Sequence, residues 1–206
     1  MKYYAGIGSR NTPIHVQKTM KEIANLLEQE EFILRSGGAN GADVAFESGI
    51  KNHSNMNIYL PFKEFNNRRH NGTSYIYIEK GDIELDPAYQ SLKHHPSKGN
   101  MRDSAKAMMM RNYFQLHGLS GQNISSFVIC WTRDGANGTT ILTDWDSGGS
   151  GQCIRLAALK NIPVYNLNDS RYNSMNAIDF VNLVLNNLKC DINPDTVIKE
   201  TTKSLF

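Results

Sequence analysis

Short apolar runs alternate along the chain with longer stretches in which apolar residues recur every three or four positions. The short runs, which we interpret as strands, are residues 3–8, 32–35, 58–60, 126–130 and 163–167. The helical spacing predicts helices over 13–30, 40–51 and 102–118, another from the glycine stretch near 150 to 160, and a last one that contains Ile178, Val181, Leu185 and Leu188. Strands that alternate with helices in this order are typical of βαβ units, whose strands pair in parallel.

This pattern predicts an α/β fold, with a mainly parallel sheet of about five to seven strands and helices on both faces. A chain of 206 residues suits one domain better than two. We expect this domain to span residues 1–190 and a tail without periodicity to span 191–206. The alternation breaks over about 61–100, which predicts a long insertion that is either a lid or wall of a site or an idle loop.

Composition narrows the classes of function. The net charge is +2, whereas nucleic-acid-binding domains usually carry a stronger basic excess, so nucleic acid is not the expected partner. No apolar run reaches the roughly 18 residues of a transmembrane helix, and no signal peptide is evident. Three cysteines without a CxxC pair favour a reducing cytoplasm. We therefore expect a cytoplasmic protein, in the host cytoplasm if the chain is viral, with no metal, cofactor or membrane partner.

Glycine-rich segments follow the predicted strands, at the edge where parallel sheets bind ligands. They are GIGSR (6–10), RSGGANGAD (35–43) and CWTRDG (130–135), and GGSGQ (148–152) leads into the next helix. Glycine lets a ligand approach the backbone, and the free N–H groups of a helix start attract anions. Each segment alone is compatible with an ordinary turn, and none matches a dinucleotide fingerprint or a P-loop. Their recurrence at several strand ends predicts a cradle for phosphate and ribose.

Four side chains near these segments have competing interpretations. Arg10 can hold a phosphate with two hydrogen bonds. Asp43 can contact ribose hydroxyls or stabilise the start of its helix, and Glu47, one turn later, fits a surface or packing role better. Trp131 can stack on a base or lie in the core, and we favour stacking because polar residues follow it.

Three other groups fit structural roles better than functional ones. We expect the consecutive methionines Met108–Met110 to fill the core. Asp144 and Asp146 could hold magnesium against phosphates, but two carboxylates in a loop are more often solvated. His94 and His95 lack the spaced partners of a zinc site.

One set of segments covers about residues 3–167: YAGIGSRNTP, LRSGGANGADVAFESG, MRN at 110–112, VICWTRDG, GGSGQCIRLA and PVYNL. Together they resemble the SLOG superfamily, which joins the fold of DNA-processing protein A (Smf) with the lonely-guy phosphoribohydrolases. The chain looks most like the small, often phage-borne members. The resemblance implies a modified Rossmann fold that binds nucleotides or nucleotide-derived signals, and it implies a homo-oligomer, either a dimer or larger.

The lonely-guy signature also implies roles for particular residues. Met108–Arg111 matches its arginine motif, so Arg111 carries over as an anion partner. Gly148, Gly149 and Gly151 match its glycine loop, with Gln152 in place of a threonine. Its paired glutamates fall on Ile154 and Arg155, and neither can stabilise the positive charge of an oxocarbenium-like transition state. The resemblance thus implies a phosphate cradle that lacks the lonely-guy catalytic acids.

The candidate ligand-binding residues are Gly8, Ser9, Arg10, Ser36, Gly37, Gly38, Ala39, Asp43, Arg111, Asn112, Trp131, Thr132, Gly148, Gly149, Ser150, Gly151 and Gln152. Our first hypothesis is that the protein binds a nucleoside phosphate, an ADP-ribose-type molecule or a cyclic nucleotide, and senses or sequesters it without turnover, in a virus as a sponge against host defence. The second is an N-glycosidase on nucleoside 5′-monophosphates that uses Asp43, Glu47 and Arg111. The third is single-stranded DNA binding, which the near-neutral charge disfavours.

Overall fold

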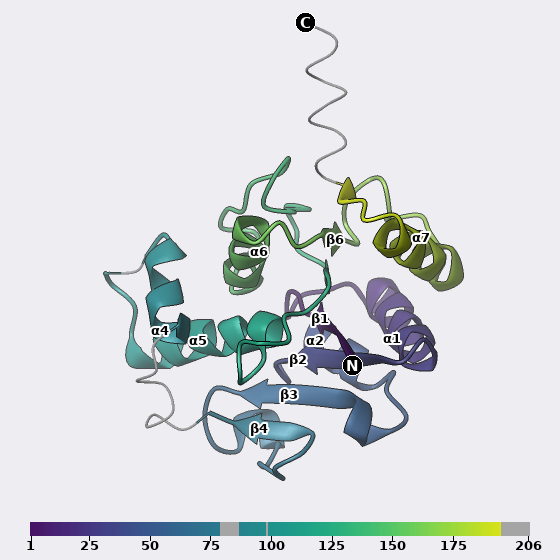
Figure 1. Cartoon of the computed structure of the whole chain (residues 1–206). Coiled ribbons are helices and arrows are strands. Elements are labelled where there is room, and N and C mark those ends of the chain that lie inside the picture. The colour runs from purple at the N-terminus through teal and green to yellow at the C-terminus, as the bar shows by residue number, and fades with distance from the viewer. Residues whose placement is uncertain (79–86, 98, 195–206) are drawn as a thin grey trace, which may run out of the picture.

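A computed structural model describes residues 1–78, 87–97 and 99–194, in which the strands form one sheet with the order β4-β3-β2-β1-β5-β6 (Figure 1). All neighbouring strands pair in parallel. The strands are β1 (Lys2–Gly6), β2 (Phe32–Ser36), β3 (Met56–Leu60), β4 (Tyr75–Tyr77), β5 (Val128–Cys130) and β6 (Val164–Asn166). The predicted parallel α/β sheet is therefore confirmed, and β1 lies inside it, with Ala5 opposite Arg35 on one side and Val128 on the other.

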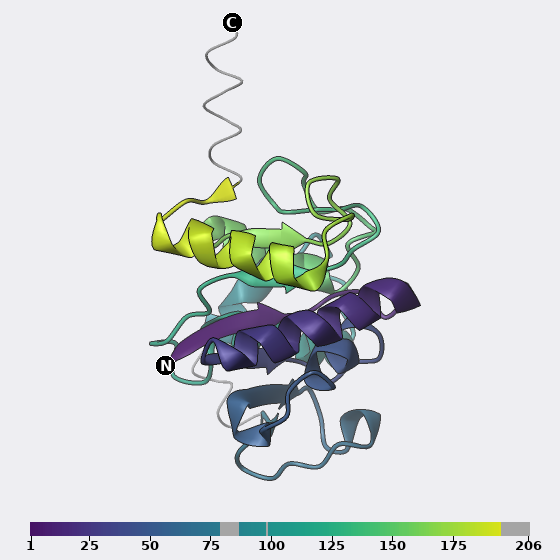
Figure 2. The same cartoon turned by 90° about the vertical axis from the view of Figure 1, so that its right-hand side faces the viewer.

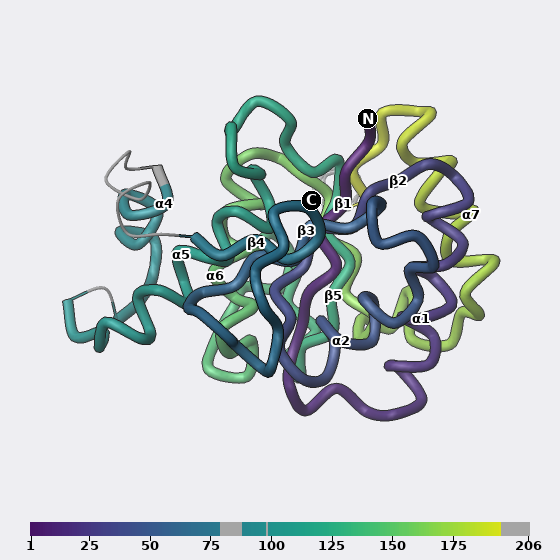
Figure 3. The backbone as a smooth tube through the Cα atoms, turned by 90° about the horizontal axis from the view of Figure 1, so that it is seen from below, coloured from purple at the N-terminus to yellow at the C-terminus, as the bar shows by residue number. Residues whose placement is uncertain are grey.

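Helices cover both faces of the sheet, as predicted. The first face carries α1 (Ile14–Gln29), α2 (Ala42–Glu47) and α7 (Ala177–Lys189), and the second carries α5 (Asp103–His117) and α6 (Ser150–Leu159) (Figures 2 and 3). The short elements are α4 (Pro87–Gln90) and the 3₁₀ turns His53–Asn55, Phe65–Asn67 and Ser91–His94. None of the described helices is long and apolar enough to cross a membrane.

The two-sided covering explains the continuous apolar runs in the sequence. Successive side chains of a strand point to opposite faces, so a strand that is covered on both faces needs apolar residues at nearly every position. Tyr4 and Ile129 pack in the core that α1, α2 and α7 cover. Their neighbours Ala5 and Cys130 pack in the core that α5 and α6 cover. The runs could therefore be recognised as strands although they do not alternate.

The segment 61–100, which we expected to be an insertion, supplies β4 and so extends the sheet by one edge strand. Glu47 of α2 anchors this segment: it accepts hydrogen bonds from the Arg68 guanidinium, with Nη2 2.7 Å from Oε2, and from the Tyr75 hydroxyl at 2.7 Å. Part of the expected insertion is thus integral to the sheet. Of the expected tail, residues 195–206 lie outside the described part of the chain.

Candidate functional site

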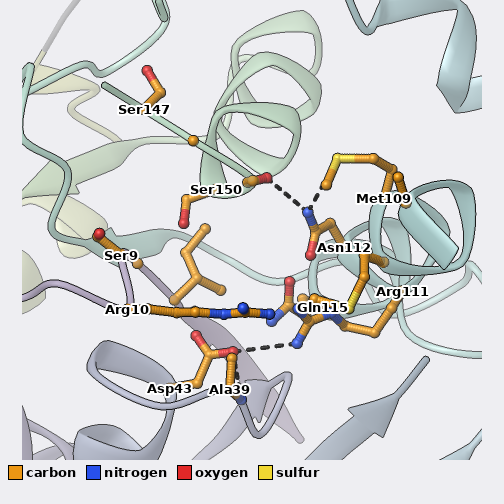
Figure 4. Close-up of a pocket in the computed structure, with 16 residues that line it drawn as sticks. Ser9, Arg10, Ala39, Asp43, Met109, Arg111, Asn112, Gln115, Ser147 and Ser150 are labelled. Atoms are coloured by element: carbon orange, nitrogen blue, oxygen red, sulfur yellow. Dashed lines mark hydrogen bonds and ion pairs between the residues drawn. The ribbon is translucent and has the colours of Figure 1, made fainter. Parts of the chain in front are cut away.

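The strand order reverses between β1 and β5, and ligands of open parallel sheets bind near the carboxyl ends of the strands at such a point. A cavity of about 380 Å³ lies beside the carboxyl end of β1, between the loop that follows this strand, the start of α2, α5 and the segment before α6 (Figure 4). Its walls include the predicted residues Gly8, Ser9, Arg10, Ala39, Asp43, Arg111, Asn112, Gly148, Gly149 and Ser150. The lining residues that sequence reasoning missed are Ile7, Ala105, Met108, Met109, Gln115 and Ser147.

The loop after β1 is fixed by backbone hydrogen bonds to two neighbouring segments. The Ser9 N–H donates to the Trp131 carbonyl at 3.0 Å, and the Ser9 carbonyl accepts from the Ala42 N–H at 3.2 Å. Gly8 has φ +153°, and a Cβ there would lie 2.7 Å from the Cβ of Ala42, so the close packing requires glycine. This loop presents Arg10, whose exposed guanidinium makes no hydrogen bond or ion pair with the described residues.

Asp43 and Arg111 form a buried ion pair at the cavity wall. Arg111 Nη1 lies 3.2 Å from Asp43 Oδ2, and the two side chains are 6% and 4% exposed. The Ala39 N–H donates to the same carboxylate oxygen at 3.2 Å. A Cβ on Gly37 would overlap the Arg111 guanidinium, so the glycine pair after β2 makes room for the protein's own arginine.

Burial and charge act in opposite directions on this pair. Burial raises the pKa of Asp43 above its ordinary value, and the Arg111 charge and the Ala39 N–H oppose the rise. Burial lowers the pKa of Arg111, Asp43 opposes that fall, and the nearby Arg10 charge adds to it. Arg10 runs across the cavity toward Arg111 and Gln115 (Figure 4). Two guanidinium groups and one carboxylate therefore meet here, which favours an anionic ligand when all three are ionised.

The segment before α6 adds backbone donors to the site. Asn112 Nδ2 donates to the Gly149 carbonyl at 2.8 Å and ties this segment to α5 (Figure 4). Gly148 has φ +54°, a conformation that favours glycine. The N–H groups of Gly149 and Ser150 find no acceptor within the described part of the chain. Such N–H groups, together with the helix dipole, stabilise an anion at a helix start by about 0.3–1 kcal/mol.

Ala105, Met108 and Met109 form an apolar wall on α5. Met109 Cε lies 3.4 Å from where a Cβ on Gly149 would be, so this wall adjoins the glycine segment. Met110 packs in the core, and Met109 packs against the same buried cluster from its edge. The expectation that these consecutive methionines fill the core is therefore confirmed for Met110 and wrong for Met108, whereas Met109 both packs against the core and lines the cavity. A thioether contacts an aromatic ring favourably, so this wall suits a planar base.

The other predicted residues, which do not line the cavity, are Ser36, Gly37, Gly38, Trp131, Thr132, Gly151 and Gln152. Trp131 is 8% exposed and packs in the core, so the stacking role that we favoured for it is wrong. Thr132 is fully buried and accepts a hydrogen bond from Asn166 Nδ2 at 2.6 Å. Both side chains are therefore part of the packed interior and do not line the cavity.

Gln152, Ser36 and Gly38 are engaged by other parts of the fold. Gln152 Nε2 donates to the Ser91 carbonyl at 2.8 Å and so joins α6 to the 3₁₀ turn after α4. The Ser36 hydroxyl donates to the Gly6 carbonyl at 2.6 Å and links the ends of β2 and β1. The Gly38 carbonyl accepts from Asn66 Nδ2 at 2.9 Å. These residues shape the loops that carry the site and do not line the cavity themselves.

The positions of the lonely-guy glutamates do not face the cavity. Ile154 is fully buried in the core, and Arg155 donates to Thr143 Oγ1 at 2.8 Å. Glu47, bound by Arg68 and Tyr75, does not line the cavity either. Asp43 is thus the only residue with a carboxylate among the described residues that line the cavity.

A metal site is not formed within the described ranges, where no group of three or more His, Cys, Asp or Glu side chains could hold an ion. Asp144 and Asp146 are exposed, and the Asp144 carboxylate accepts from the Asp146 N–H at 2.7 Å. Ser147 is held at the cavity by a hydrogen bond from its hydroxyl to Asp134. Although burial raises the pKa of Asp134, this bond and others to the carboxylate bring it below its ordinary value.

No protein-family model and no curated protein sequence matches the chain. Its fold is similar to that in a structure of DNA processing protein A from Helicobacter pylori, which describes the single-stranded DNA binding mode of that protein. The two chains are 12% identical and give a TM-score of 0.39, over 90% of this chain and 81% of the other. A likeness at this distance carries no functional argument, and membership of the SLOG superfamily stays a prediction.

Proposed function

We propose that the protein binds a nucleotide-derived small molecule in this cavity and holds it without turnover. The observation that carries the proposal is the unpartnered Arg10 guanidinium at a cavity that also exposes the free N–H groups of Gly149 and Ser150. A guanidinium and helix-start N–H groups together are a typical phosphate site. The apolar wall of Met108 and Met109 offers a surface for a base.

The size of the cavity favours a mononucleotide. Its volume of about 380 Å³ is near the lower end of the roughly 300–1,000 Å³ that small-molecule sites usually have. A nucleoside monophosphate is the better match to a cavity of this volume, because ADP-ribose and cyclic dinucleotides are larger molecules. We therefore rank nucleoside phosphates first and the larger molecules second.

The small number of acidic side chains in the cavity supports binding without turnover. Glycosidases usually need two carboxyl groups on opposite sides of the scissile bond. The described walls supply one, Asp43, which is paired with Arg111. Sensing or sequestration of the ligand is the function that such a site supports best. In a virus-borne protein, sequestration would remove a host signalling nucleotide.

The test combines binding with the fate of the ligand. The purified protein would be incubated with AMP, GMP, ADP-ribose, NAD, cyclic ADP-ribose, cyclic dinucleotides and, as a comparison, a single-stranded DNA oligonucleotide. A ligand present at about 100 times its Kd should add roughly 2.7 kcal/mol to the free energy of unfolding, which a thermal shift detects. Mass spectrometry of the molecule released by denaturation should then return it intact. Binding of the oligonucleotide alone would contradict the proposal.

An N-glycosidase is the second candidate, because Asp43 lines the cavity and its pKa is raised by burial. A carboxyl group beside the ligand can act as a general acid when it is protonated. In the same experiment, this activity would release a free base from a nucleoside 5′-monophosphate. Asp43→Asn should then abolish release, whereas Asp103→Asn, on the exposed start of α5, should not change it.

A further inference from the structure

We propose that Asp43 recognises the sugar of the ligand, by accepting a hydrogen bond from a ribose hydroxyl, and that the cavity therefore prefers ribonucleotides to deoxyribonucleotides. This inference rests on the proposed function and adds to it the class of sugar. The residue would act in recognition whether or not the ligand is turned over.

The two oxygens of the Asp43 carboxylate differ in their surroundings. Oδ2 accepts both the Ala39 N–H and Arg111 Nη1, each at 3.2 Å. Oδ1 has no donor among the described residues, although Asp43 lines the cavity. In Figure 4 one oxygen faces Arg111 and the other turns away from it, toward the side of Ser9 and Arg10. An ionised carboxylate has about four acceptor sites, so this oxygen is open to a donor from a ligand.

The sign of the charge decides which part of a nucleotide lies beside Asp43. A phosphate is repelled by a carboxylate and belongs with Arg10 and the N–H groups of Gly149 and Ser150. The donors of a nucleotide are its sugar hydroxyls and the amino or imino groups of its base. Because the apolar wall at Met109 lies across the cavity from Asp43 (Figure 4), a base on that wall leaves the hydroxyls nearest to Oδ1.

Arg111 is a positioning residue in this scheme. Its guanidinium lies against Gly37 and 6.0 Å from the centre of the Phe65 ring, and it holds Oδ2 from a buried position in the cavity wall. The direction of Oδ1 is therefore set before a ligand arrives. A group that is already oriented loses little entropy on binding, which makes the hydrogen bond more selective.

The experiment compares sugars within one base. Titration calorimetry would measure the Kd of adenosine, guanosine, cytidine and uridine 5′-monophosphates, each with its 2′-deoxy and 3′-deoxy counterparts. For whichever base binds, removal of the hydroxyl that Asp43 contacts should raise the Kd about ten- to a hundredfold, the usual effect of losing a hydrogen bond to a charged group. In Asp43→Asn the ratio of deoxy to ribo Kd should fall to within about threefold. Asp103→Asn is the matched control and should keep the ratio of the unmodified protein.

Each outcome bears on one of the two proposals. Equal Kd values for ribo and both deoxy forms in the unmodified protein would overturn the role of Asp43 and leave the proposed function intact. A ratio that survives in Asp43→Asn would assign the sugar to another residue and also overturn it. If the Asn variant does not fold, the comparison of sugars with the unmodified protein decides alone. If no nucleotide binds, the proposed function fails and this inference fails with it.

Discussion

Replacement of Arg111 by methionine should destabilise the protein by an amount that depends on pH. Methionine is long, flexible and apolar, so it fills most of the vacated space and the loss is mainly one of charge. Asp43 would keep the Ala39 N–H as its donor while remaining buried. Removal of one partner of a buried ion pair typically costs about 3–5 kcal/mol. Since folded proteins are stable by only about 5–15 kcal/mol, the loss would be easy to measure.

The pH dependence follows from the pKa of Asp43. Burial raises this pKa in the folded protein, so the folded state binds the proton more tightly than the unfolded chain does. The stability that this proton contributes is fully present below the unfolded pKa and is lost as pH rises through the folded pKa. Without Arg111, which opposes the rise, the folded pKa moves further up. At low pH, where Asp43 is neutral, the variant should therefore lose little of its free energy of unfolding. At high pH, where Asp43 is ionised, it should show the full loss.

Urea unfolding at about pH 5 and about pH 7.5, followed by circular dichroism, measures both effects. With an m-value of about 3 kcal/mol per molar urea, the midpoint of Arg111→Met should fall by roughly 1–2 M at the higher pH and by clearly less at the lower. The double variant Asp43→Asn, Arg111→Met removes both charges and should regain much of the loss. An unchanged midpoint at pH 7.5, or the same decrease at both pH values, would refute this account of the pair.

Three further predictions test other parts of the site and fold. Gly37→Ala should lower stability by about 1–3 kcal/mol in thermal unfolding, because its methyl group would displace a buried guanidinium, whereas Gly99→Ala, with open space around it, should not. Arg10→Gln should weaken nucleotide binding in calorimetry about ten- to a hundredfold and leave the thermal midpoint unchanged, because the side chain is exposed and unpartnered. Iodoacetamide at pH 8 should modify the exposed Cys190 and spare the buried Cys153, whose pKa is raised to about 12 by burial, and mass spectrometry of tryptic peptides would reveal any exception.

The fold could be predicted because its signals are local. The apolar runs are long enough to indicate strands, and α1 shows its buried face directly through Met20, Ile23 and Leu27. The edge strand β4 could not be predicted in this way, since its three residues are only half-buried and stand among turn-forming residues. Its place in the sheet depends on distant partners: it pairs with β3, and Glu47 of α2 contacts both Arg68 and Tyr75.

The candidate site could be predicted only as far as the strand ends. The position of a residue after a strand places it at the correct edge of the sheet, but the path of the following loop decides where its side chain points. Ser9 and Trp131 both follow a strand and even share a hydrogen bond, yet one lines the cavity and the other enters the core. Met108 and Met109 were missed because the rotation of α5 about its axis is set by its packing on the sheet, which the sequence does not display.

Gly37 shows what a glycine signal can and cannot reveal. Its lack of a side chain does indicate close approach, but the approaching group is Arg111 and not a ligand. The proposed function therefore gives the two arginines of the site different roles, although both attract anions in the sequence-based interpretation. Arg111 forms an ion pair with Asp43, whereas Arg10 has no partner among the described residues and so remains available to a phosphate. Substitution of Arg111 should therefore reduce stability first and binding as a consequence, whereas substitution of Arg10 should reduce binding alone.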